Sequence, residues 1–119
     1  MDREARLSDE QAERTLTLCE AIRTRPGIYI SRFDWFTVNA FWHWYFTALG
    51  DAVRREFWQW SLNFLGEPTA NVDPVDLLRR RHGLATDVAG EAALNRERAA
   101  EIAALVCDVV APFVSEHRE

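Results

Sequence analysis

The side chains best suited to acid–base or metal chemistry are three histidines, His43, His82 and His117, which stand far apart in the sequence of 119 residues. None belongs to an HExxH motif, and none has a cysteine or second histidine at the spacing of a metal-ligand pair. His43 could line a pocket, since it lies within an aromatic segment. A histidine at the edge of a core is more often a hydrogen-bonded structural residue, and that interpretation is favoured.

The other reactive side chains also fit structural roles better than catalytic ones. Cys19 and Cys107 each occupy an apolar stretch, which favours buried thiols over a disulfide or a metal site. Glu97 and Glu101 share one face of a predicted helix, but Arg98 beside them and the lack of a Glu-x-x-His motif favour an exposed, solvated face. No GxxxxGK[ST] or GxGxxG phosphate-binding loop occurs. The sequence therefore predicts a protein that is not an enzyme, with no catalytic residue, no bound metal and no cofactor.

Local signals predict helices near both ends of the chain. Ser8 and Gln11 form a capping box at the start of a first helix, residues 9–24, which the following Pro-Gly turn ends. A final helix is expected over about residues 91–110. A kink or a stop is expected at Pro112, because its ring would collide with the carbonyl group four residues earlier in a continuing helix.

The middle of the chain holds thirteen of the fourteen aromatic residues, between Tyr29 and Phe64. A second helix is expected from about residue 37 towards residue 55, with an aromatic continuation to residue 65 and a possible bend at Gly50 or a break near residue 55. It contains the run FWHWYF and has only one polar stripe, formed by Asn39, His43, Thr47, Asp51 and Arg55. The residues expected to face the core are Phe41, Tyr45 and Leu49. A helix with so narrow a polar face is either central in a bundle or covered by a partner.

A short helix is expected from Pro74, because Asp73 suits the N-cap and proline suits the first helical position. Together the elements predict one all-α domain over residues 1–119, a small bundle of about four helices around the aromatic-rich second helix. The net charge of −5 disfavours binding to nucleic acid or to an anionic membrane. The N-terminal segment has no apolar stretch that would direct export, so a cytoplasmic location is expected.

Residues 22–30, IRTRPGIYI, resemble the RPGMYIG element of gyrase B-type ATPases. The ATPase function is not supported, because Trp35 replaces the acid of the E-x-x-x-N helix that would end at Asn39, and no D-x-G-x-G loop occurs. Over residues 10–65 the chain resembles a group of small bacterial proteins that includes immunity-type proteins of polymorphic toxin systems. The shared features are an N-terminal helix, an RPGMY(I/L)-type turn and an aromatic-rich helix.

This resemblance implies a non-catalytic protein-binding domain, most concretely an immunity protein that neutralises a cognate bacterial toxin by occlusion. Tryptophan anchors within an acidic rim would hold such a partner. The residues predicted to bind it are Trp35, Trp44, Trp58, Trp60, Glu91, Glu97 and Glu101. Two alternatives remain open: a helical homodimer of unknown role, and a small-molecule-binding or enzymatic domain with a pocket near His43.

Overall fold

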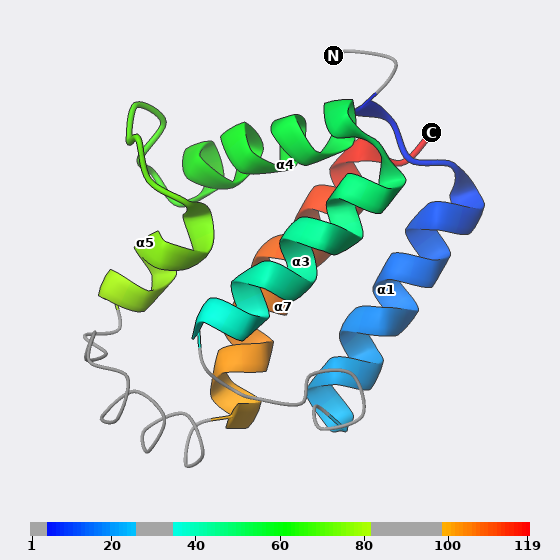
Figure 1. Ribbon diagram of the computed structural model, residues 1–119. Coiled ribbons are helices and arrows are strands. Elements are labelled where there is room, and N and C mark those ends of the chain that lie inside the picture. The colour runs from blue at the N-terminus through cyan, green and yellow to red at the C-terminus, as the bar shows by residue number, and fades with distance from the viewer. Residues whose placement is uncertain (1–4, 26–34, 82–98) are drawn as a thin grey trace.

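The computed structural model describes residues 5–25, 35–81 and 99–119, and these ranges form an all-α bundle, as predicted (Figure 1). The helices are α1 (Asp9–Thr24), α3 (Trp35–Leu49), α4 (Asp51–Phe64), α5 (Pro74–Arg81) and α7 (Ala99–His117). The one extended contact in the described ranges is an isolated parallel bridge between Leu7 and Arg118. Most of the RPGIYI segment, residues 26–30, lies outside the described residues.

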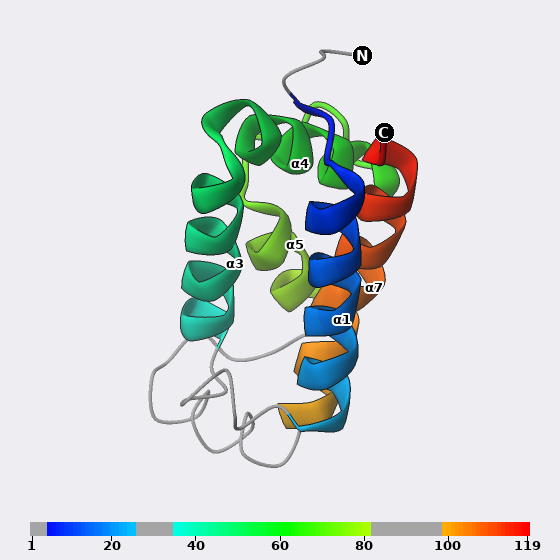
Figure 2. The ribbon, with the colours of Figure 1, turned by 90° about the vertical axis from the view of Figure 1, so that its right-hand side faces the viewer.

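Helices α1 and α7 lie side by side and run in opposite directions, and α3 faces them from the other side of the bundle (Figures 1 and 2). Helix α4 crosses the upper end of this group, and α5 then descends beside α3 (Figure 1). Helix α7 packs against α1, α4 and α5, while α3 packs mainly against α4 and α5. The pairing of α1 with α7 is reinforced by an ion pair between Arg23 and Asp108 at 2.8 Å.

The first helix has the predicted bounds because its capping box forms. The backbone N–H of Gln11 donates to Ser8 Oγ at 3.1 Å, and the backbone N–H of Ser8 donates to Gln11 Oε1 at 2.9 Å. The helix buries Ala12, Cys19 and Ile22 in the core, and Leu16 is half-buried and packs against it. Each capping contact satisfies an N–H group that has no partner within the helix.

The predicted second helix is divided at Gly50, which separates α3 from α4. Gly50 has φ 134° and ψ 146°, a conformation that residues with a Cβ rarely adopt. Its N–H donates to the carbonyl oxygens of Phe46 and Thr47, both at 3.1 Å, which closes α3. Gly50 therefore separates two helices that run in different directions. The sequence predicted either a bend in one helix at this glycine or a break nearer residue 55.

The predicted core face of α3 needs a correction. Val38, Trp42 and Phe46 are buried, at 0%, 2% and 1% exposure, whereas Phe41, Tyr45 and Leu49 are half-buried and pack against this core. The predicted stripe holds in part: His43, Asp51 and Arg55 are exposed, while Asn39 and Thr47 are half-buried. The core face is rotated by about one residue, because α4 and α5 together cover the side of α3 that carries Trp42.

The last helix does not end near residue 110 or stop at Pro112, as one of the two expectations had it, since α7 continues through this proline to His117. A proline inside a helix costs about 3 kcal/mol. Phe113 and Val114 follow it and are fully buried, and each such side chain contributes about 1.5–3 kcal/mol on burial. Burial of these two residues therefore offsets the proline penalty. The predicted start near residue 91 lies outside the described residues.

The core at the crossing of α3, α4 and α7 is aromatic. The Phe46 and Phe57 rings are stacked at 4.2 Å between centroids, and both meet Phe113 edge to face at 5.7 and 5.1 Å.

Among the helices that the structure describes, none is long and apolar enough to cross a membrane.

Candidate functional site

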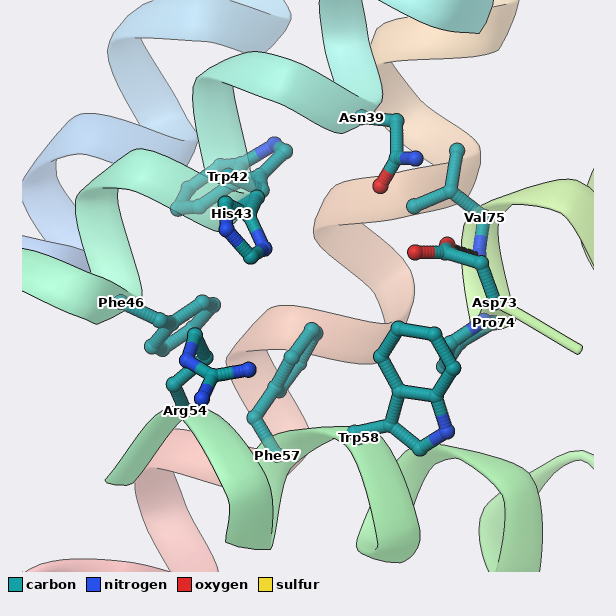
Figure 3. A pocket seen from close by; sticks show the side chains of 10 residues that line it. All are labelled: Asn39, Trp42, His43, Phe46, Arg54, Phe57, Trp58, Asp73, Pro74 and Val75. Atoms are coloured by element: carbon teal, nitrogen blue, oxygen red, sulfur yellow. Dashed lines mark hydrogen bonds between the residues drawn. The ribbon is translucent and has the colours of Figure 1, made fainter. Parts of the chain in front are cut away.

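A pocket lies where α3, α4 and the start of α5 meet (Figure 3). The space not filled by atoms in and in front of it amounts to about 340 Å³ with open solvent included, and the centre of a water-sized sphere can occupy about 30 Å³ of it. Its lining residues are Asn39, Trp42, His43 and Phe46 from α3, Arg54, Phe57 and Trp58 from α4, and Asp73, Pro74 and Val75 at the start of α5. The pocket near His43 that the sequence left open as an alternative therefore exists.

Two local features position the pocket walls. The turn at Gly50 directs α4 across the end of α3, so that Phe57 stacks on Phe46. The Asp73-Pro74 pair starts α5 as predicted, since Asp73 Oδ1 accepts the backbone N–H of Val75 at 2.8 Å. The N-cap carboxylate is thereby fixed at the pocket edge, across from His43 and Arg54 (Figure 3).

Four aromatic side chains make the pocket predominantly apolar. Trp42 and Phe46 have ring centroids 5.9 Å apart, and the Phe46–Phe57 stack continues this surface onto α4. Trp58 is half-buried and stands beside Asp73 and Pro74 in Figure 3. Trp42 and Phe46 are almost fully buried, so the rings with surface open to a ligand are those of Phe57 and Trp58, which are half-buried.

Asp73 supplies the negative charge of the pocket. With the Asn39 amide oriented nitrogen-first, that nitrogen donates to both Asp73 carboxylate oxygens at 3.2 Å. Burial raises the pKa of Asp73, and the hydrogen bonds from Val75 and Asn39 oppose the rise. Within the described ranges no arginine or histidine forms an ion pair with this carboxylate. Its hydrogen bonds are satisfied, but its charge is not compensated.

The opposite side of the pocket carries Arg54 and His43. Arg54 donates through Nε and Nη2 to Asp51 Oδ1, at 3.3 and 3.2 Å, so its charge is offset locally. The His43 ring lies 5.5 Å from the Trp44 ring in an edge-to-face arrangement. Trp44 is 68% exposed, which makes it the most exposed large apolar side chain that the structure describes. The exposed indole therefore neighbours the pocket residue His43 but does not line the pocket.

The predicted partner-binding residues have different surroundings. Trp44 is exposed and Trp58 lines the pocket. Trp60 contacts α7, because its Nε1 donates to Glu116 Oε2 at 2.9 Å and its ring lies 5.5 Å from that of Phe113. These contacts give Trp60 a role in the fold, and its place at an interface stays a prediction.

The acidic rim was predicted from Glu91, Glu97 and Glu101. Glu101 is exposed in the first turn of α7 and does not line the pocket. Glu91, Glu97 and the side chain of Trp35 lie outside the described residues. The structure therefore places Trp58 in the pocket lining and Trp44 on the exposed surface of α3 outside it, and leaves the rim as a prediction.

Sequence reasoning missed Asp73 and Asn39 as pocket residues. Asp73 carries a recognisable signal, but for an N-cap, and Asn39 belongs to the predicted polar stripe. Their contact depends on the packing of α5 against α3, which no local pattern specifies.

The cysteines and His117 belong to the core. Cys19 and Cys107 are free and buried, and the Cys107 thiol approaches the Cys19 carbonyl oxygen at 3.7 Å. Contact with the Cys107 thiol and burial together raise the pKa of Cys19, which keeps that thiol protonated at neutral pH. His117 is 1% exposed, its Nδ1 lies 2.9 Å from the Phe113 carbonyl oxygen, and its ring stacks on Phe113 at 4.1 Å. These groups stabilise the packing of α7.

The arrangement is suited to binding. Among the residues that the structure describes, the pocket lining contains no serine, threonine or cysteine, and His43 has no hydrogen-bonded acid to orient it as a base. No group of three or more His, Cys, Asp or Glu in the described ranges could hold a metal ion.

Comparisons with protein-family models, curated proteins and solved structures find no match to this chain. The resemblance to immunity-type proteins therefore stays a prediction.

Proposed function

We propose that this chain is a non-catalytic protein-binding domain, most concretely a cytoplasmic bacterial immunity protein that neutralises a cognate toxin by covering it. The observation that carries the proposal is the exposed Trp44. The same helix buries Trp42 at 2% exposure, so α3 places one tryptophan in the core and the other in solvent.

Trp44 has the properties of an interface anchor. Tryptophan is enriched among the residues that dominate binding energy, because it buries a large surface while losing little side-chain freedom. The His43 ring lies 5.5 Å from this exposed ring and also lines the pocket. A partner that covers Trp44 would therefore also meet His43.

The charge of the chain favours a basic partner. Its net charge is −5, and an acidic binding protein associates rapidly with a positively charged cleft. A toxin that acts on an anionic substrate would present such a cleft. Occlusion of that cleft needs tight binding and no turnover.

Co-expression with the product of an adjacent toxin-like gene tests the proposal. The parent chain is expected to restore growth and to co-purify with the toxin, whereas Trp44→Ala is expected to weaken binding at least tenfold. Phe64→Ala is a matched control, because Phe64 is also exposed, at 51%, but stacks on Trp60 away from the pocket lining. Loss of rescue and co-purification by the folded parent chain, with the toxin shown to be active, contradicts the proposal. A concentration-dependent mass without a partner would instead favour the homodimer.

A further inference from the structure

We propose that the pocket between α3, α4 and α5 binds a methylated ammonium group, the trimethylammonium head of a small quaternary amine. This inference goes beyond the proposed function and does not depend on it, since it rests on the pocket and not on the Trp44 surface. Three features of the lining lead to it: the aromatic walls, the uncompensated carboxylate and the way in which the carboxylate is already hydrogen-bonded.

The aromatic walls suit a cation that is large and weakly hydrated. Trp42, Phe46, Phe57 and Trp58 line one pocket: Trp42 and Phe46 are almost fully buried, whereas Phe57 and Trp58 are half-buried and keep surface open to a ligand. The negative face of an aromatic ring attracts a cation, most strongly when the ring belongs to tryptophan and the site is desolvated. Several rings around one cavity are the usual arrangement for recognising quaternary ammonium groups.

The charge of the lining favours a cation over an anion. Asp73 is a half-buried carboxylate without an ion-pair partner in the described ranges, and a buried charge is costly until an opposite charge joins it. Arg54 does not remove this preference, because its guanidinium is paired with Asp51 at 3.2 Å. A ligand cation in the pocket would compensate Asp73.

The hydrogen bonds of Asp73 distinguish a quaternary amine from a primary amine or a guanidinium. The carboxylate already accepts the Val75 N–H at 2.8 Å and the Asn39 amide at 3.2 Å. A primary ammonium carries three donors and a guanidinium five, and each needs acceptors that the aromatic walls lack. A quaternary ammonium has no N–H, so it can bring its charge to Asp73 without leaving a donor unsatisfied.

Choline and its uncharged isostere 3,3-dimethyl-1-butanol provide the test, by titration of the full chain followed in two-dimensional NMR spectra. Choline is expected to shift the Asn39 side-chain amide and the Trp58 indole signals, with at least tenfold higher affinity than the isostere. Equal affinities would show a merely apolar pocket and overturn the proposal. The absence of choline-induced shifts at the pocket signals would overturn it as well.

Two variants locate the cation. Asp73→Asn keeps an N-cap oxygen and removes the charge, so choline affinity should fall at least tenfold while the circular dichroism spectrum stays unchanged. Asp76→Asn is the matched control, because Asp76 lies on the same helix, outside the pocket lining, in ion pairs with Arg79 and Arg80. It should change the affinity by about twofold or less, since the Asp76 charge is already paired with Arg79 and Arg80 outside the pocket lining. Equal losses in the two variants would contradict direct contact with Asp73.

A third variant and a second ligand complete the test. Trp58→Leu removes one aromatic wall from a half-buried position and should weaken choline binding several-fold without weakening the isostere equally. If it weakens both equally, the cation–π contribution is refuted. A peptide containing trimethyl-lysine carries the same head group, and its affinity relative to choline shows whether the natural source is a free amine or a modified protein.

Discussion

The two neighbouring tryptophans of α3 should respond very differently to the same substitution. Trp42 is 2% exposed and Trp44 is 68% exposed, although both belong to one helix. A buried aromatic side chain removes roughly 150–250 Å² from water, worth about 4–6 kcal/mol at about 25 cal/mol per Å². Measured losses for Trp→Ala in cores are about 3–5 kcal/mol, and we expect a value in this range for Trp42→Ala.

For Trp44→Ala the expected loss is much smaller. Only about a third of its surface is removed from water, which corresponds to about 1–2 kcal/mol by the same area arithmetic. Alanine forms helix better than tryptophan by roughly 0.5 kcal/mol, and this gain acts against the loss. The net cost should therefore be about 1 kcal/mol or less.

Urea denaturation of the parent chain and both variants, followed by circular dichroism, measures the difference. The helix-propensity gain is the same at both positions, so it cancels when the two variants are compared. Equal losses of unfolding free energy would refute the placement of Trp42 in the core and Trp44 in solvent. They would also remove the main support for an anchor at Trp44.

Other substitutions test single contacts. Gly50→Ala should cost about 1–3 kcal/mol in urea denaturation, from backbone strain alone, because φ is 134° and an added Cβ meets nothing within 4 Å; an unchanged midpoint would contradict this conformation. Tyr45→Phe should cost about 0.5–1.5 kcal/mol, because it removes the 2.6 Å hydrogen bond between the Tyr45 hydroxyl and Thr15 Oγ1; no loss would argue against this link between α1 and α3. Burial raises the pKa of Asp73 above 3.8, so the folded state binds this proton more tightly than the unfolded state does. The stabilisation that the bound proton gives is fully present below pH 3.8 and is lost as the pH rises through the folded-state pKa. Asp73→Asn should accordingly be at least as stable as the parent at pH 7 and lose this advantage below about pH 4, and a variant that is less stable at pH 7 but not at low pH would reverse the predicted sign.

Local signals in the sequence predicted the elements whose ends are set by local contacts. The capping box at Ser8 and Gln11 fixed the start of α1, and the Asp73-Pro74 pair fixed the start of α5. Each depends on side chains within three residues of the backbone group that they satisfy. The all-α class followed from the same signals together with helical spacing.

Features that depend on tertiary packing were not predictable in the same way. FWHWYF is apolar on most sides, so its spacing could not show that Trp42 rather than Phe41 faces the core. The length of α7 depends on burial of Phe113 and Val114, which outweighs the local effect of Pro112. The pocket needs contacts among three helices, and only its possible presence near His43 could be anticipated.

Binding of a purified toxin by the parent chain and by Trp44→Ala tests the central proposal most directly. The toxin would be the product of the adjacent toxin-like gene, and isothermal titration calorimetry would give both affinities. The account predicts tight one-to-one binding by the parent chain and at least tenfold weaker binding by a folded Trp44→Ala variant. Absence of binding by the parent chain to an active toxin, or equal affinity of the two proteins, would contradict it.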